Sequence, residues 1–362
     1  MSGQWPVVSG QLNTAFHMPG HKRNVELLSN ALPYAIDITE IAGMDNLQHP
    51  QGLLLDIMQR AQALWGSDGA YMSVNGATGA MLAGVRAMTS YGDTVLVACN
   101  CHMSVFHAIE LCGLHAVLLE PEWLPHWGMY GAITQQVIDQ AVAEHPQASL
   151  CIITSPTYEG VISTVRTDIP LLIDTAHGAH LDLPQADLIV HSLHKTLPAL
   201  TQTAMLHVRG SRVDRAKLEH NLRIFQTSSP SYVLMASIAE CVALLEEHKQ
   251  AWFAQWHERL EKFYAHAQRW KNIELFWPCD KSKLLIRCDA EQAAAFLRQC
   301  GIEPEYAHQC RMLCLTSPCD TDDMMAQLTQ ALDDLDNLAL STKHLAPEKP
   351  PLGELSNGWK WG

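Results

Sequence analysis

The feature that most constrains the fold of this chain is the alternation of short apolar runs with helical stretches over its central third. Several runs are continuously apolar, as is typical of parallel strands that are covered on both faces. Such strand–helix–strand repetition favours an α/β fold with a mostly parallel, doubly wound sheet. The expected strands are Thr94–Ala98, Ala116–Leu119, Leu150–Thr154, Leu171–Asp174, Leu188–His191 and Ala204–Val208. The expected helices between them include Gly79–Tyr91, Ser104–Leu111 and Thr134–Glu144.

The pattern changes after Pro230. A long helical stretch, Tyr232–Trp270, is expected to be interrupted near Glu247–Gln250, and a smaller α+β unit follows it. The predicted domains are an N-terminal segment (1–50), a large domain (51–240), a small C-terminal α+β domain (241–340) and an extended tail (341–362). The elements expected in the small domain are the strands Lys283–Cys288 and Arg311–Thr316 and the helices Ala290–Cys300 and Thr321–Asp336.

The net charge and the cysteines limit the partners and the compartment to be expected of this chain. With 24 Lys+Arg against 38 Asp+Glu the formal charge is −14, which argues against nucleic acid or an anionic membrane surface as the main partner. The N-terminus does not resemble a signal peptide, and no apolar run approaches the ~18 residues of a membrane helix. The 11 cysteines include no CxxC pair, so we expect reduced thiols and a cytoplasmic protein.

A lysine directly follows one of the buried strands. Ser192-Leu193-His194-Lys195-Thr196 lies at the edge of the sheet where open α/β folds bind ligands. There the amine of Lys195 is suited to attack an aldehyde, although lysine is more often a solvated surface residue. Asp174 ends the preceding strand and could keep a pyridine nitrogen protonated; alone, it could equally be a cap or turn residue. Together they predict a pyridoxal-phosphate site.

Two further elements lie at strand ends. The small residues of Val74–Gly79, VNGATG, let backbone N–H groups approach a phosphate at a helix N-terminus, although the same residues also make an ordinary helix start. His102 follows the strand at 94–98 and could stack on a planar cofactor or simply be packed. Their convergence with Lys195 and Asp174 at the strand ends of one sheet favours a single cofactor site.

Two HxxH spacings, His177–His180 and His191–His194, do not predict a metal site. They lack the glutamate and the i,i+4 spacing of a zinc helix, and the second pair flanks a strand end. We therefore expect no metal.

Longer motifs surround these residues. They are FHMPGHKR (16–23), DITEIAGMDNL (37–47), VNGATG (74–79), NCHMSV (100–105), SPTYEG (155–160), DTAHGAHL (174–181), SLHKTLPALTQTAMLH (192–207) and QTSSPSY (226–232). With them the chain resembles the Orn/Lys/Arg decarboxylase family of fold-type-I pyridoxal-phosphate enzymes. The resemblance runs from Phe16 to about Tyr232, and a weaker similarity continues through GIEPE (301–305). It implies a fold-type-I transferase fold for the large domain.

The resemblance also implies roles for matching positions. Lys195 matches the lysine that forms a Schiff base with pyridoxal 5'-phosphate, and Asp174 matches the partner of the pyridine nitrogen. His102 matches the histidine stacked on the ring, and Ala176 the small residue on the other face. His194 is expected beside the Schiff base, so the predicted catalytic residues are Lys195, His194 and His102.

Phosphate and ring contacts complete the predicted site. Thr78 and Ser192 match phosphate-binding residues, and Gly79 belongs to the same loop as Thr78. His177 is expected near the ring. The family's site lies at a dimer interface, so Thr227 or Ser228 is expected to reach a neighbour's phosphate, in a homodimer or a higher homo-oligomer.

The predicted function is decarboxylation of a basic amino acid, lysine, ornithine or arginine, in amino-acid and polyamine metabolism. The chain departs from the family at Cys99 and Met103 around the stacking histidine, at Ala77 in the phosphate loop, and at Thr175. It also stops before the large C-terminal domain of longer members, so it is expected to be a short member whose substrate is open. Another pyridoxal-phosphate reaction (aminotransferase, lyase or cyclase) is the first alternative, and a cofactor-binding regulatory subunit is the second.

Overall fold

The computed structural model describes residues 18, 32–41, 44–338 and 349. Much of the predicted N-terminal segment (1–50) therefore lies outside the described residues, as does the predicted tail (341–362) apart from Lys349. In the part of the chain that is described, none of the helices combines the length and the apolarity needed to cross a bilayer. The predicted domain boundaries stay a prediction.

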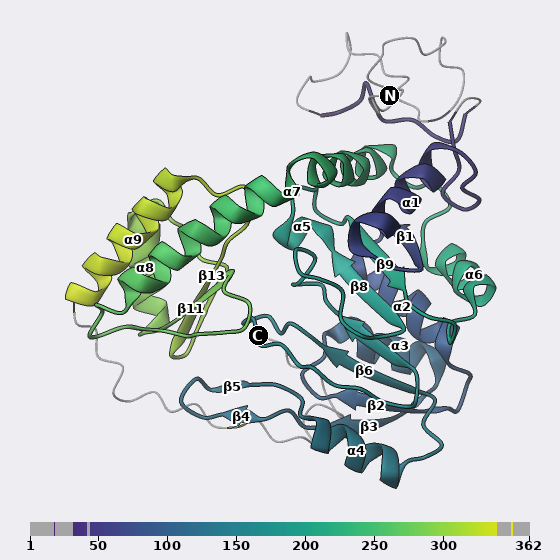
Figure 1. The fold of residues 1–362 in the computed structure, drawn as a ribbon, viewed down its shortest axis with the longest axis horizontal. Helices are drawn as coiled ribbons and strands as arrows, with labels where there is room; N and C mark the ends of the chain where they lie inside the picture. The colour runs from purple at the N-terminus through teal and green to yellow at the C-terminus, as the bar shows by residue number, and fades with distance from the viewer. Residues whose placement is uncertain (1–17, 19–31, 42–43, 339–348, 350–362) are drawn as a thin grey trace. The chain divides into compact units, whose positions relative to one another are not determined.

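The main sheet has seven strands in the order β1-β9-β8-β7-β6-β2-β3 (Figure 1). β7 pairs with β8 in parallel, as does β2 with β6, whereas β9 is antiparallel to both β8 and β1. The mixed α/β fold with a mostly parallel sheet is thus confirmed. The strands are β1 (Gly69–Ser73), β2 (Thr94–Ala98), β3 (His115–Leu119), β6 (Leu150–Thr154), β7 (Leu171–Asp174), β8 (Leu188–Ser192) and β9 (Ala204–Val208).

Each of the six predicted strands is present within one residue of its expected bounds. The antiparallel direction of β9 departs from the expected doubly wound pattern, because only residues 193–203 join β8 to β9. That connection is too short for the crossover that a parallel neighbour needs. The strand β1 was not among the expected strands, and its residues GAYMS include no β-branched side chain.

One compact unit comprises the described parts of Met1–Asp93 together with Met103–His115 and Pro170–Lys249. In this unit α2 covers β7 and β8 closely. A Cβ on Gly84 would lie 3.3 Å from Leu172 Cδ1 and 3.4 Å from Leu188 Cδ1, so a glycine permits this approach of helix to sheet. The helices wholly in this unit are α1 (Leu53–Trp65), α2 (Gly76–Met88), α3 (Met103–Cys112), α5 (Leu193–Thr196) and α6 (Arg215–Phe225).

The second unit comprises Thr94–His102, Ala116–Ile169 and the described parts of Gln250–Gly362. Its own antiparallel sheet has the order β10-β11-β13-β12, and α8 and α9 lie side by side next to it (Figure 1). Besides β2, β3 and β6, its elements are β4 (Trp123–Leu124), β5 (Met129–Tyr130), α4 (Gln135–Glu144), β10 (Glu274–Leu275), β11 (Lys283–Arg287), α8 (Ala290–Gln299), β12 (Tyr306–His308), β13 (Arg311–Leu315) and α9 (Asp322–Asn337).

The expected strands and helices of this second unit are confirmed within one residue or two. Side chains of Thr134, Asp289 and Thr321 accept hydrogen bonds from the first turns of α4, α8 and α9, which explains why these helices begin where they do. One buried cluster joins α8, α9, the sheet and the end of α7 around Trp256, Leu284 and Leu332.

The helix α7 corrects one prediction. It runs without a break from Tyr232 to Ala267 over 36 residues, although an interruption was expected near Glu247–Gln250. Because this polar stretch contains neither glycine nor proline, its residues are compatible with a continuous helix. The division between the two units falls within it, between Lys249 and Gln250. The polar residues thus mark a change of unit instead of a helix end.

Candidate active site

The Lys195 amine lies at the end of a fully buried strand. Every residue of β8 is buried, and the chain turns directly into the short helix α5, which carries Lys195 half-buried. The Nζ atom of Lys195 lies 2.9 Å from Nε2 of His177. An ammonium group has only donors, so it would donate to a neutral His177 at this position. The structure thus brings together two predicted site residues from neighbouring strand ends.

Asp174 is the last residue of β7, the strand beside β8. It pairs in register with Val190, and only 4% of its surface is exposed. Its Oδ1 accepts a hydrogen bond from the backbone N–H of Ala176 at 3.0 Å, which holds the turn that leads to His177. The Thr175 hydroxyl donates to the Val190 carbonyl at 2.9 Å and ties the same turn to β8. A buried carboxylate and a lysine amine therefore lie at the same ends of two adjacent strands.

His194 is held by a different group. Its Nδ1 lies 3.1 Å from the carbonyl oxygen of Thr203, and the same carbonyl accepts a hydrogen bond from the backbone of Leu193. The Thr203 carbonyl thus anchors α5 just before β9. The predicted place of His194 beside the Schiff base stays a prediction, and His177 is the histidine with a described contact to the amine.

The predicted phosphate loop joins β1 to α2. Its turn requires Gly76, which has a φ of +69°. Thr78 is exposed in the first turn of α2, while Gly79 is buried. A Cβ on Gly79 would lie only 2.8 Å from Asn75 Cβ, so this glycine keeps the loop tight. The loop places backbone N–H groups at a helix N-terminus, the arrangement that binds anions.

Two glutamines brace this loop and were missed by the sequence analysis. Gln202 donates through Nε2 to the Val74 carbonyl at 2.6 Å. The backbone carbonyl of Gln202 accepts a hydrogen bond from the Gly76 N–H at 3.0 Å. Gln226 accepts from the Val74 N–H at 3.1 Å and donates to the Met72 carbonyl at 3.2 Å. Both residues lie inside the motifs quoted above. The only indication of their role was chemical, since a side-chain amide can both donate and accept a hydrogen bond.

The turn that carries Ser228 lies beside the phosphate loop of its own chain. The Thr227 N–H donates to Asn75 Oδ1 at 3.3 Å, and the Thr227 carbonyl accepts from Gln48 at 3.0 Å. Ser228 itself is exposed. Its predicted contact with a neighbour's phosphate stays a prediction, as do the phosphate contacts of Thr78 and Ser192.

His102 belongs to the second unit. It follows β2, is exposed, and comes directly after Cys101, whose thiol donates to the Ile152 carbonyl. Its predicted stacking on the cofactor stays a prediction, as does the predicted place of Ala176, which is buried in the turn after β7.

Comparison with known proteins settles the family. The family model described as "Orn/Lys/Arg decarboxylase, major domain" matches residues 8–287. The chain belongs to the Orn/Lys/Arg decarboxylase family. Residues 174–195, which hold the Asp174, His177 and Lys195 cluster, lie within this match.

Relatives of this decarboxylase-family chain include proteins with and without a named activity. An uncharacterized protein of Bacillus subtilis (strain 168), YaaO, is 35% identical over 278 residues, which are 69% of this chain and 58% of that protein. An arginine decarboxylase of Bacillus cereus is 31% identical over 365 residues, covering 88% of this chain and 78% of the relative. The chain thus spans well under two thirds of YaaO and about three quarters of the arginine decarboxylase.

Solved structures confirm the fold of this family member. The lysine decarboxylase of Francisella novicida matches with a TM-score of 0.79 at 18% identity, over 91% of this chain and 58% of that one. Fold-type-I pyridoxal-phosphate enzymes outside the family also share the architecture. The predicted fold class is therefore confirmed.

A buried histidine cluster lies next to the site in this decarboxylase-family chain. His191 on β8 and His207 on β9 have ring centroids 4.8 Å apart, and Trp65 packs against both. Nδ1 of His207 lies 3.2 Å from Ser67 Oγ. Burial lowers the pKa of His207 to about 3, and burial with the nearby His207 lowers that of His191 well below its ordinary value. Both rings therefore remain neutral in the folded protein.

These two histidines make stability depend on pH. Their pKa values are lower in the folded state than in the unfolded state, so the unfolded chain binds more protons and the stability falls as pH drops below about 6.5. Replacing His207 by Asn is expected to remove about 2 kcal/mol of the stability loss between pH 7 and pH 5. Urea unfolding at both pH values measures this, with His220→Asn on the exposed surface of α6 as the control. Equal pH dependence in His207→Asn and the unaltered chain would contradict the buried neutral state.

The expectation of no metal concerned the spacings His177–His180 and His191–His194. Among the residues with described positions, no group of three or more His, Cys, Asp or Glu side chains is arranged to hold a metal ion. The His191 ring instead packs against Trp65 and His207.

Proposed function

We propose that this chain is a pyridoxal-phosphate-dependent decarboxylase of a basic amino acid, lysine, ornithine or arginine, with Lys195 as the residue that binds the cofactor covalently. The observation that supports this most is the placement of a buried carboxylate, Asp174, and a lysine amine at the ends of the paired strands β7 and β8. The basic substrate is supported by the arginine and lysine decarboxylases among the relatives.

The residues present fit this cofactor chemically. The Lys195 amine suits an aldehyde, and the buried Asp174 carboxylate suits a protonated pyridine nitrogen. Thr78 and Ser192 offer hydroxyls to a phosphate. A Cβ on Gly76 would meet no atom within 4 Å, so there is open space beside this glycine at the N-terminus of α2, a kind of position that binds anions.

Pyridoxal phosphate, when bound, supplies an electron sink for the pair released as a bond to Cα breaks. The chain's own residues would set the proton positions around it. The Asp174 carboxylate would hold the ring nitrogen in its protonated form, and His177 would take or return a proton at Lys195 Nζ over the 2.9 Å contact. The Thr203 carbonyl fixes the imidazole of His194 through Nδ1, which leaves Nε2 to carry a proton toward Cα.

The test of this function is product identification. The purified protein, supplied with pyridoxal phosphate, is incubated separately with lysine, ornithine and arginine, and the products are identified by mass spectrometry. We expect the corresponding amine and carbon dioxide from one of them. A keto acid in place of an amine would move the chain to the aminotransferases. No turnover of any of the three would contradict decarboxylation of a basic amino acid.

His177 is expected to govern the protonation of Lys195. Replacing His177 by Gln removes the imidazole nitrogen next to the amine, so kcat should fall by about 100-fold and the pH profile should change shape. His220→Gln, which alters an exposed side chain of α6, should leave the profile unchanged. The measurement is kcat across pH 6–9 for the three proteins. An unchanged profile in His177→Gln would exclude this role.

The same proposal includes a homodimeric or larger homo-oligomeric cytoplasmic enzyme whose amine product enters polyamine metabolism. All 11 cysteines lie in the described residues and none is in a disulfide there, which supports a reducing compartment. Ser228, exposed beside the phosphate loop, supports a site completed by a second subunit. Sedimentation of the purified protein measures the assembly.

A further inference from the structure

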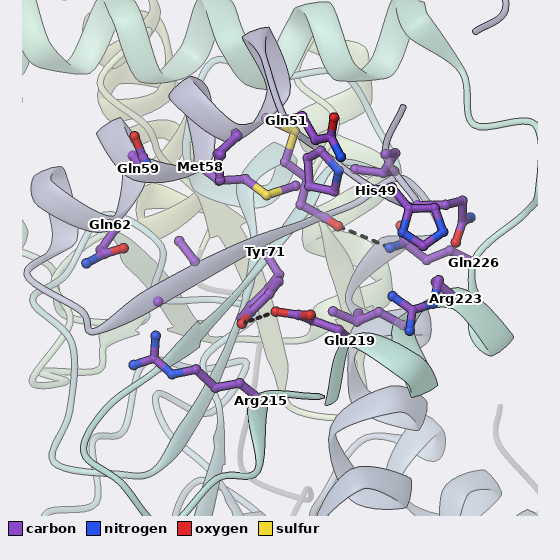
Figure 2. Close-up of a pocket in the computed structure, with 18 residues that line it drawn as sticks. His49, Gln51, Met58, Gln59, Gln62, Tyr71, Arg215, Glu219, Arg223 and Gln226 are labelled. Carbon is purple, nitrogen blue, oxygen red and sulfur yellow. Dashed lines mark hydrogen bonds between the residues drawn. The ribbon is translucent and has the colours of Figure 1, made fainter. Parts of the chain in front are cut away.

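A pocket of about 410 Å³ lies in the unit that carries Lys195, but other residues form it. Its walls are the loop Leu47–Gln51, the helix α1, the strand β1, the helix α6 and Gln226 (Figure 2). Among the described residues that line it there is no predicted cofactor contact. Its volume is within the range of small-molecule sites.

The helix α6 gives the pocket its charge. Arg215, Glu219 and Arg223 follow one another at four-residue intervals, so they lie along one face of the helix and line the pocket together. Within the described part of the chain, neither arginine has an ion-pair partner. The pocket therefore presents two guanidinium groups to solvent in a chain with a net charge of −14, which favours an anionic ligand.

The carboxylate between the arginines is already engaged. The Tyr71 hydroxyl donates to Glu219 Oε1 at 3.1 Å (Figure 2). Burial and then the charge of Glu219 raise the pKa of Tyr71 to about 12, so the phenol stays neutral and keeps donating. Figure 2 draws this pair between Arg215 on one side and Arg223 on the other. The middle of the pocket thus repels a further negative charge.

The remaining pocket walls suit an uncharged part of a ligand. Leu55, Met58 and Leu222 supply apolar surface, and the side chains of Gln59 and Gln62 supply amides. Arg215 lies against β1, since a Cβ on Gly69 would be 3.5 Å from Arg215 Nη1. The glycine therefore leaves space for the guanidinium at that end.

We propose that this pocket binds a small organic anion with two acidic groups, one held by Arg215 and the other by Arg223. Residues eight apart on a helix are about 12 Å apart along its axis, so one carboxylate or phosphate cannot be shared easily between them. A ligand with an acidic group at each end and an uncharged middle matches the two arginines, the apolar floor and the engaged Glu219.

The experiment is calorimetric titration of the purified full-length chain with α,ω-dicarboxylates from succinate to sebacate, with acetate as the monoanion. We expect saturable one-to-one binding that is at least tenfold tighter for a longer member than for succinate, and none for acetate. Arg215→Gln and Arg223→Gln should each weaken the best ligand at least tenfold. Glu219→Gln should strengthen it severalfold, because a negative charge is removed from the middle of the pocket.

His220→Gln is the matched control, since His220 is exposed on the same helix and does not line the pocket. Its affinity should equal that of the unaltered chain. The proposal is overturned if no dicarboxylate binds saturably, if affinity is independent of length, or if both arginine variants keep full affinity. The gain expected in Glu219→Gln cannot arise from misfolding. The measurement needs neither cofactor nor turnover, so its outcome is separate from that of the proposed function.

Discussion

Replacing Lys195 by Ala is expected to abolish covalent retention of pyridoxal phosphate and to lower decarboxylation on the order of 10⁴-fold or more. In the proposed function the Lys195 amine is the nucleophile, and it lies just after β8, 2.9 Å from a histidine that can exchange a proton with it. Borohydride reduction of the loaded protein, followed by peptide mass spectrometry, should locate the cofactor on Lys195 in the unaltered chain and on no residue in the variant.

A second lysine of the same unit provides the control for this experiment. Lys217 on α6 is also partly buried, and its Nζ donates to the Thr89 carbonyl at 3.1 Å. Lys217→Ala should keep both the near-visible absorbance of the loaded protein and the reduced adduct on Lys195. An adduct of unchanged stoichiometry in Lys195→Ala would show that another amine holds the cofactor.

The framework of the site was predictable because it follows from local sequence. The apolar runs of β7 and β8 are short and continuous, and their ends carry Asp174 and Lys195. Once two such strands are parallel neighbours, their C-terminal ends meet at one edge of the sheet. The pairing of Asp174 with Val190 places them there in register. The apolar runs and the parallel direction of the strands were sufficient to predict that Asp174 and Lys195 lie at one edge of the sheet.

The side-chain contacts around Lys195 were not predictable in the same way. His194 is its neighbour in sequence, but successive residues of a helical turn point in different directions, and the described contact of His194 Nδ1 is with the Thr203 carbonyl. The histidine with a described contact to the amine is His177, which comes from the turn after another strand. Adjacency in sequence is thus a poor guide to contact once the chain turns into a helix.

The glutamines that brace the phosphate loop illustrate a second limit. Gln202 and Gln226 reach Val74 across separations of 128 and 152 residues. Such bonds are satisfied by the particular geometry of the folded chain and leave no periodic pattern in the sequence. They also explain why the loop is held from both sides, because one amide donates to the Val74 carbonyl and the other accepts from its N–H.

Replacing Asp174 by Asn is expected to lower kcat by at least about 100-fold, while the cofactor remains attached to Lys195. The substitution keeps the size of the side chain but removes the charge proposed to hold a proton on the ring nitrogen, so the transition state should lose more than the bound ground state. Steady-state kinetics should therefore show a large fall in kcat with little change in KM. Borohydride should still fix the cofactor on Lys195.

The control is a second buried carboxylate at the opposite end of the same strand pair. Asp187 precedes β8, is 5% exposed, and accepts from the Leu171 N–H at 2.8 Å and from Arg212 at 2.7 Å. Asp187→Asn should lower the free energy of unfolding by about 1–3 kcal/mol and leave kcat of the folded protein unchanged. If both variants lost stability alike and Asp174→Asn kept full kcat, Asp174 would be a structural residue of the β7 end, since only a charge used in the reaction separates the two carboxylates kinetically.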